Sequence, residues 1–201
     1  MNIFFLQKQN MSGVAHLHVS CISTGFISSL GLDFLTALYE AIVKDFNSFC
    51  LVAEDQGKVL GFVAFTENLG RLYKSAVKSN GIKLILAIGL KMFHPSVCQR
   101  IIQNIFYPSK TDKMDLPKAE LLSIVVDPAF QGKGIAKQLC QAGLVQCRKR
   151  GIDKVKVLVA ANNEPANRLY IKCGFELVIQ VDSHSIPSNI YVADLTTLIN
   201  V

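Results

Sequence analysis

The sequence predicts a single α/β domain that carries a helical insertion and contains no linker. Half of its residues are hydrophobic and 18% are charged, which is the composition of a packed globular protein. After residue 118, apolar runs typical of strands alternate with apolar residues at helical spacing. The length of 201 residues suffices for one buried core and is short for two.

The first 66 residues predict a strand, two helices and a β-hairpin. Residues 2–6 form a short apolar run, and residues 11–22 and 34–42 carry apolar side chains at helical spacing. Asp33 is a candidate N-cap of the second helix. Two apolar runs, 49–54 and 59–65, flank a turn that contains Gly57, and this pattern is typical of a hairpin.

Residues 67–117 differ in character and predict a helical insertion. Apolar side chains at helical spacing begin at Leu69, and Asn80-Gly81 is expected to end that helix. Residues 82–93 are apolar nearly all round, and Pro95 begins a third helical segment that reaches Phe106. The apolar stretch of 82–93 contains two lysines and is shorter than the roughly 20 residues that a membrane span requires.

From Ala119 the pattern predicts strands and helices in alternation. The expected elements are a strand over 120–126, a glycine turn over 131–136, a helix over 136–147, a strand over 155–159, a short helix over 166–173 ended by Gly174, and closing strands over 176–181 and 190–193.

The stretch from Val126 to Ala136 leads from an apolar strand through a glycine turn into a helix. The first N–H groups of a helix are unpaired and carry partial positive charge, so such a turn binds phosphate. Gly132 and Gly134 allow a phosphate to approach the backbone closely. An ordinary strand–helix turn has a similar pattern, and the spacings of a P-loop and of a dinucleotide-binding loop are both missing. Further cationic side chains in the same block are Lys133, Lys137, Arg148, Lys149 and Arg150.

Two motifs together carry a resemblance to a known family. Residues 131–136, Gln-Gly-Lys-Gly-Ile-Ala, fit Q/R-x-x-G-x-G/A. Residues 163–175, Asn-Glu-Pro-Ala-Asn-Arg-Leu-Tyr-Ile-Lys-Cys-Gly-Phe, fit N-x-x-A-x-x-L-Y-x-K-x-G-F at every fixed position. In this order and separation they resemble the GNAT superfamily of acyl-CoA N-acyltransferases, specifically over residues 118–180. The insertion 67–117 departs from the compact family pattern, in which these strands connect briefly.

The resemblance implies an α+β fold with a mixed, mostly antiparallel sheet flanked by helices. It places the helical insertion 67–117 between strands 3 and 4 of one domain that spans residues 1–201. It also implies a cofactor site: backbone groups of the strand would contact pantetheine, the glycine loop would wrap the pyrophosphate, Asn163 would bind near the pantetheine arm, and Tyr170 would lie close to the thioester sulfur. The residues implied are Ile124, Val125, Val126, Gln131, Gly132, Lys133, Gly134, Ile135, Ala136, Asn163 and Tyr170.

Two side chains are candidates for catalysis. Tyr170 could protonate the departing thiolate or only donate a hydrogen bond to it, and the alternative is a half-buried packing tyrosine. Glu120 lies eleven residues before Gln131, where several family members place their general base. Strand alternation puts Glu120 on the face of Leu122, Ile124 and Val126, so apolar surroundings are expected to raise its pKa. The alternative is a solvated carboxylate in a protein that deprotonates its acceptor through water.

The cysteines and histidines predict neither a metal site nor a covalent thiol mechanism. No C-x-x-C pair or zinc spacing occurs among the six cysteines, and Cys140 and Cys147 fall on the apolar stripe of their helix. His16 and His18 cannot share a helix face, and His94 and His184 are isolated. Free thiols and the absence of a visible secretory signal favour the cytoplasm.

The leading functional hypothesis is an N-acetyltransferase that moves an acyl group directly from acetyl-CoA, its co-substrate, to a primary amine. The acceptor would be a small molecule, a sugar amine, a polyamine or a protein amino group. The alternative is a catalytically weak domain that binds CoA as a sensor or scaffold.

The net charge of +6 is concentrated in residues 71–113 and 128–160. Such blocks attract phosphates, nucleic acid or anionic membranes, although many are solvated helix faces. No nucleic-acid reader motif accompanies them, which argues against a nucleic-acid partner. Residues 82–106 are compatible with a lid, a peripheral contact with the inner face of a membrane or a homodimer contact, and with an added helical layer.

Overall fold

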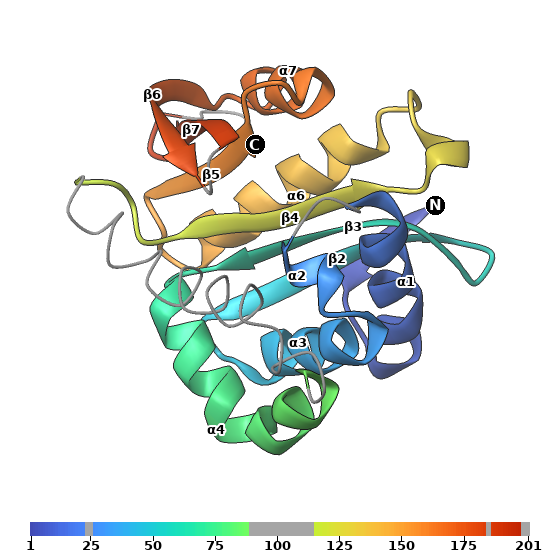
Figure 1. Cartoon of the computed structure of the whole chain (residues 1–201). Helices are drawn as coiled ribbons and strands as arrows, with labels where there is room; N and C mark the ends of the chain where they lie inside the picture. The colour runs from blue at the N-terminus through green and yellow to red at the C-terminus, as the bar shows by residue number, and fades with distance from the viewer. Residues whose placement is uncertain (23–25, 89–114, 184–185, 198–201) are drawn as a thin grey trace.

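The computed structural model describes residues 1–22, 26–88, 115–183 and 186–197 (Figure 1). Its strands form one seven-stranded sheet in the order β1-β2-β3-β4-β5-β7-β6. The neighbouring pairs are antiparallel except for β4 and β5, which are parallel. The mixed, mostly antiparallel sheet that the resemblance implies is therefore confirmed.

The described elements follow one another along the chain. They are β1 (Asn2–Phe5), α1 (Met11–Cys21), α2 (Phe26–Ser29), α3 (Leu32–Lys44), β2 (Ser48–Asp55), β3 (Lys58–Thr66), α4 (Leu69–Ile88), β4 (Glu120–Val126), α6 (Ile135–Lys149), β5 (Lys154–Ala160), α7 (Glu164–Lys172), β6 (Glu176–Ser183) and β7 (Ile186–Asp194). Short 3-10 turns precede α1 (Lys8–Asn10) and follow β4 (Pro128–Phe130).

The predicted hairpin is confirmed, and its turn explains its two central residues. Strands β2 and β3 are joined by Gln56 and Gly57 alone, because Asp55 pairs with Lys58. Gln56 has a φ of 48° and Gly57 a φ of 78°. Positive φ at both central residues is the geometry that matches the right-handed twist of two antiparallel strands.

Helices cover both faces of the sheet and enclose two cores (Figure 1). On one face, α6 and α7 pack on the inner strands through side chains that include Leu139, Leu144 and Tyr170. On the other face, α1 and α3 pack through side chains that include Val14 and Leu35. The candidate site lies at the strands β4 and β5 between these layers.

The capping of α3 and the end of α4 differ from the sequence-based expectation. Gly31 is the N-cap of α3, and Asp33 lies inside its first turn rather than capping it. Helix α4 continues through Asn80-Gly81 to Ile88, because Gly81 does not adopt the positive φ of a helix-ending glycine. Gly174 does adopt it, with a φ of 86°, and there the predicted end of α7 is correct.

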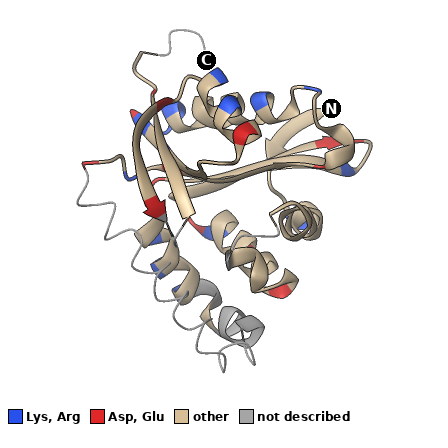
Figure 2. Ribbon diagram, turned by 45° about the horizontal axis from the view of Figure 1, so that its top comes forward, with Lys and Arg blue, Asp and Glu red and all other residues tan. Residues whose placement is uncertain are grey.

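The described part of the insertion is helix α4, which packs on the outer side of α3. Ala76 of α4 is buried against Ala37 and Ala41 of α3, since small side chains let the two helices approach closely. Arg71, Lys74 and Lys78 are exposed on α4 (Figure 2). The segment predicted to begin at Pro95, and Lys91, lie outside the described residues. No helix in the described ranges is long and apolar enough to cross a bilayer.

Candidate active site

Strands β4 and β5 meet at a single residue pair. Glu120 is in register with Lys156, and the Lys156 N–H donates to Ala119 O at 2.9 Å. Beyond this junction the described strands share no further register pair, although β4 stays paired with β3 along its whole length. The facing edges of β4 and β5 therefore carry backbone groups that no strand ladder satisfies, and such groups need water or a ligand.

The alternation of β4 identifies which backbone groups face this open edge. Asp127 N–H donates to Leu60 O on β3 at 2.8 Å, so the groups of Val126 and Ile124 point to the opposite edge, toward β5. Ile124 is only half-buried although β4 lies inside the sheet. An extended ligand with amide groups could complete the ladder here.

A β-bulge at Leu122 changes the faces of β4. Ala64 of β3 pairs with Ser123 and Phe65 pairs with Leu121, so Leu122 is the extra residue. Leu122 then packs in the α1–α3 core, whereas Ile124 and Val126 pack in the α6–α7 core. The expectation that Glu120 shares one face with all three is therefore wrong, because strict alternation does not survive a bulge.

Glu120 lies buried at the junction. Its Oε2 is 3.8 Å from the Nζ of Lys156, and both side chains are less than one tenth exposed. Burial raises the pKa of Glu120 to about 7, against the lowering effect of Lys156. The same Oε2 has no hydrogen-bond partner among the described residues. A carboxylate with this pKa and an open lone pair can accept a proton near neutral pH.

The region of the insertion also reaches Glu120. Tyr73 on α4 is half-buried, and both burial and the charge of Glu120 raise the pKa of its phenol. The surroundings of Glu120 are thus not simply apolar, since they include the ammonium of Lys156 and the phenol of Tyr73.

A polar chain that the sequence did not reveal ends at the bulge. His18 Nδ1 and Tyr39 OH are 2.7 Å apart, and Tyr39 OH is 3.4 Å from Ser123 Oγ. Burial lowers the pKa of His18 to about 4, so its ring is neutral at neutral pH. His18 stacks on Phe62 inside the α1–α3 core. Sequence reasoning found only that His18 cannot share a helix face with His16. It could not find this chain, because Tyr39 and Ser123 come from α3 and β4.

The glycine loop lies at the far end of β4 and begins α6. Gly134 is the N-cap of α6 with a φ of 78°, and Gly132 has a φ of 77°. A Cβ on Gly132 would meet nothing within 4 Å, so the backbone conformation rather than crowding explains this glycine. Gln131 Nε2 donates to Val126 O at 3.1 Å and holds the loop against the strand. Lys133 lies over the Phe130 ring at 5.0 Å.

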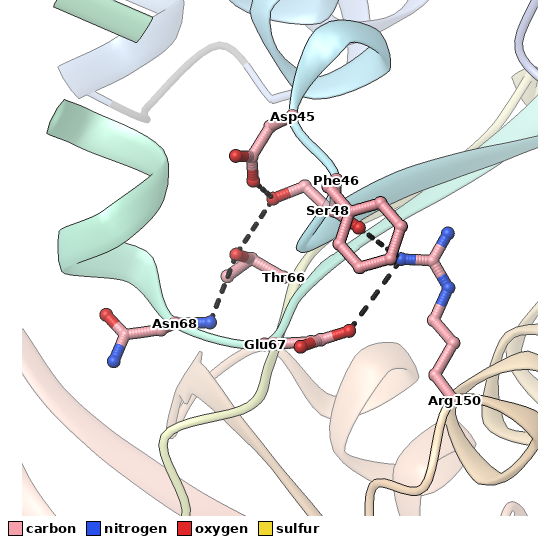
Figure 3. A network of polar contacts seen from close by, with 7 residues as sticks. All are labelled: Asp45, Phe46, Ser48, Thr66, Glu67, Asn68 and Arg150. Atoms are coloured by element: carbon pink, nitrogen blue, oxygen red, sulfur yellow. Dashed lines mark hydrogen bonds and ion pairs between the residues drawn. The ribbon is translucent and has the colours of Figure 1, made fainter. Parts of the chain in front are cut away.

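The basic cluster at the end of α6 does not join this loop. Arg148 and Lys149 lie in the last turn of the 15-residue helix, about 20 Å from its start. Arg150 donates to Phe46 O at 3.0 Å and pairs with Glu67 at 3.8 Å (Figure 3). Its guanidinium also lies over the ring of Phe49. Their closeness in the sequence suggested that all these cationic side chains act together. The length of α6 instead separates Lys133 and Lys137 at its start from Arg148 and Lys149 at its end.

Tyr170 lies on α7, and Asn163 is the N-cap residue that precedes this helix, in the turn after β5. Tyr170 is buried against Phe175 and Tyr191, with ring centroids 5.6 and 6.3 Å away. Burial, with smaller effects of Cys140 and Cys173, raises the pKa of its phenol, so it stays protonated at neutral pH. Asn163 caps α7 through its Oδ1, which accepts from Ala166 N–H, and this leaves its Nδ2 to donate elsewhere.

The described thiols lie mainly in the cores. Cys140 and Cys147 are buried, as their place on the apolar stripe predicts, and so are Cys50 and Cys173. No group of three or more His, Cys, Asp or Glu side chains in the described ranges could hold a metal ion. Cys98, His94 and His184 lie outside those ranges.

Comparison with known proteins agrees with the two motifs. Mycothiol acetyltransferase of Saccharomonospora viridis is 44% identical over 62 residues, which are 31% of this chain and 20% of that protein. The [ribosomal protein bS18]-alanine N-acetyltransferase of Haemophilus ducreyi is 37% identical over 73 residues, 36% of this chain and 50% of that protein. The chain thus spans a fifth to a half of the length of these curated relatives.

Solved structures share the fold over nearly the whole chain. The yncA acetyltransferase of Salmonella typhimurium, determined with its cofactor acetyl-CoA, superposes with a TM-score of 0.64 at 17% identity and covers 99% of this chain and 96% of its own. The family model of the GNAT acetyltransferases matches residues 22–175, more than half of the sequence. This chain therefore belongs to the GNAT family of acetyltransferases.

Proposed function

We propose that this protein transfers the acetyl group of acetyl-CoA directly to a primary amine. The observation that carries the proposal is the single-pair junction of β4 and β5, which leaves two strand edges open and leads to the glycine loop of α6. The acetyl-CoA in the yncA structure supports the same co-substrate.

The proposed co-substrate site runs along β4 from its middle to α6. Backbone groups of Ile124 and Val126 would contact the pantetheine arm, and Asn163 Nδ2 would donate to it. The sequence-based expectation also included Val125, but its backbone groups face β3, where it pairs with Phe62. The N–H groups at the start of α6 would hold the pyrophosphate, because a helix N-terminus stabilises negative charge. This loop comprises Gln131, Gly132, Lys133, Gly134, Ile135 and Ala136.

The proposed chemistry uses Glu120 and Tyr170 at the two ends of one transfer. Glu120 takes a proton from the acceptor ammonium, and the neutral amine attacks the thioester carbon. The C–N bond forms, the C–S bond breaks, and the Tyr170 phenol donates its proton to the departing thiolate. The new amide nitrogen then loses its extra proton through water, and this proton restores the phenol. The raised pKa of each group fits its part, a base that titrates near pH 7 and an acid that is protonated there.

The acceptor is proposed only as a class, a primary amine on a small molecule, a sugar or a protein. The names of the relatives point to different acceptors, mycothiol in one case and an alanine of a ribosomal protein in the other. We place the acceptor near Glu120 and α4, since the phosphate-binding loop occupies the opposite end of β4. The free thiols of the described chain support a reducing compartment such as the cytoplasm.

The proposal is tested by CoA binding and by turnover, measured separately. Calorimetry with CoA and release of free thiol from acetyl-CoA across a panel of amino sugars, polyamines and alanine-terminated peptides are the two measurements. Binding with turnover supports the enzyme, and Glu120→Gln should then recover activity as the pH rises and more amine is already neutral. Binding without turnover across the panel supports the sensor alternative, and absence of CoA binding overturns both.

A further inference from the structure

Asn167 forms a saturated hydrogen-bond hub beside the proposed co-substrate site. Its Nδ2 donates to Asn163 O at 2.7 Å and to Ala160 O at 3.0 Å, with Ala161 O as a longer contact at 3.5 Å. Its Oδ1 accepts from Asn189 Nδ2 and from Tyr191 OH, both at 2.8 Å. A side-chain amide has two donor hydrogens and two acceptor lone pairs, so this one is fully used.

The hub joins three segments, α7, the turn before it and β7, which meet where β5 ends. Its carbonyl partners form the turn between β5 and α7, which ends at the cap residue Asn163. Its two donors come from β7, the strand that pairs with β5 on the other side. The turn is also tied to β7 by the hydrogen bond from Ala161 N–H to Pro187 O, at 2.8 Å.

The side-chain amide of Asn167 contacts one proposed site residue, Asn163, and the ring neighbour of another, Tyr170. On the donor side, the amide adds a second hydrogen bond to the carbonyl of Asn163, which already accepts the backbone N–H of Asn167 at 3.0 Å. The Nδ2 of Asn163 is left to donate to a ligand. On the acceptor side, it orients Tyr191, whose ring lies 6.3 Å from that of Tyr170. Asn167 is buried, and the loss of a hydrogen bond at a buried group costs more free energy than the loss of one at the surface.

We propose that Asn167 is a positioning residue of the acyl-CoA site, which sets the place of Asn163 and Tyr170 along the pantetheine arm. The proposal rests on the proposed function. The fixed positions of the motif over 163–175 do not include residue 167, so this role belongs to the chain's own sequence rather than to the motif. Asn167 itself need not touch the ligand.

The test compares two ligands that use different parts of the site. Asn167→Asp keeps the shape and the acceptor oxygen but turns a second oxygen toward the carbonyls of the turn, which repel it. Calorimetry should show the dissociation constant of CoA rising about tenfold, the equivalent of roughly 1.4 kcal/mol. The phosphoadenosine diphosphate fragment of CoA, which depends on the α6 loop, should bind within about twofold of the wild type.

Two further variants separate positioning from general destabilisation. The double variant Asn189→Ala with Tyr191→Phe removes both donors to Asn167 but keeps the contacts of Asn167 with the turn. It replaces the aspartate variant as the test if that variant fails to fold. It should weaken CoA binding and spare the fragment. Ser48→Ala removes another buried hydroxyl, in the network around Asp45 and Thr66 (Figure 3), and should lower Tm without changing CoA affinity.

The outcomes distinguish this inference from the proposed function. A selective loss of CoA affinity in the hub variants supports the role of Asn167. Equal losses for CoA and for the fragment, or unchanged binding of both in a folded variant, overturn it while the proposed function stands. A wild-type protein that binds no CoA overturns the proposed function and this inference with it.

Discussion

Lys156 and Glu120 form a buried ion pair at the point where β4 and β5 diverge, and the ammonium opposes the effect of burial on the carboxyl. Lys156→Met removes the opposing charge, so the pKa of Glu120 should rise above its value of about 7. The carboxyl carbon of Glu120, followed by NMR across pH, reports this midpoint directly.

Lys154→Met is the matched control for this prediction. Lys154 lies two residues away on β5, where it pairs with Asp194 at the surface. Its removal should leave the Glu120 midpoint in place. A midpoint that is the same in the wild type and in Lys156→Met would show that Lys156 does not set the charge of Glu120.

Tyr170→Phe should lower kcat by about ten- to a thousandfold and change the KM for acetyl-CoA little, because a proton donor acts mainly in the transition state. The ring packing against Phe175 and Tyr191 is kept in this variant. Steady-state kinetics with the best amine of the panel measures the split. Turnover by Tyr170→Phe at the wild-type rate would show that Tyr170 acts only in packing.

At the residue scale, sequence reasoning found the residues that the motifs point to and missed those that only tertiary packing brings to them. The spacing to Gln131 pointed to Glu120, and its raised pKa agrees with the expectation. Lys156 was hidden, because in the run Lys154-Val155-Lys156-Val157 two alternating lysines suggest a solvated face. Only the register with Glu120 shows that the second lysine is inside.

At the element scale, the ends of helices and the irregularities of strands were least predictable. The expected strand over 120–126 has the bounds observed, but its bulge at Leu122 depends on pairing with β3 and has no local signal. Helix α4 passes Gly81 although a glycine inside a helix costs about 1 kcal/mol, and Ala76, earlier in the same helix, packs on α3. Gly174 ends its helix as expected, because it adopts the positive φ of a helix-ending glycine.

The loop before α6 gives a prediction about backbone shape. A Cβ at Gly134 would meet only Gln138 Nε2, at 4.0 Å, so Gly134→Ala acts through its φ of 78° rather than through a clash. The strain should turn the first N–H groups of α6 away from a pyrophosphate and weaken CoA binding about tenfold, at a stability cost of about 1–2 kcal/mol. Calorimetry measures the first effect and urea unfolding the second.

Gly57→Ala provides the control for that strain. Gly57 has the same φ of 78° and equally open surroundings, but it lies in the hairpin turn between β2 and β3. It should lower stability by a similar amount and leave CoA affinity unchanged. Equal CoA binding by the Gly134 variant and the wild type would remove the loop from the site.

At the scale of the whole molecule, the predicted class of fold, a mixed and mostly antiparallel sheet flanked by helices, is confirmed. The sequence could not show that α4 lies along α3, because Ala37, Ala41 and Ala76 carry little pattern of their own. It also could not show that the site draws on both layers, Glu120 near α4 and Tyr170 on α7. Contacts between segments far apart in the chain decide both.

Two buried groups on different elements should give the whole protein an unusual dependence of stability on pH. The pKa of His18 falls from 6.5 to about 4 on folding, so the native state binds fewer protons there, and stability is lost as the pH falls through that interval. The pKa of Glu120 rises from 4.5 to about 7, so its stabilising effect is complete below pH 4.5 and is lost as the pH rises to 7.

Between about pH 4.5 and 6.5 the two effects have opposite signs, and each amounts to about 1.4 kcal/mol per pH unit. The free energy of unfolding in urea should therefore change little across this interval in the wild type. In Glu120→Gln only the His18 effect remains, so stability should rise with pH. In His18→Phe, which keeps the aromatic contact with Phe62, only the Glu120 effect remains, so stability should fall up to about pH 7. Three parallel curves would show that neither group is buried in the form described.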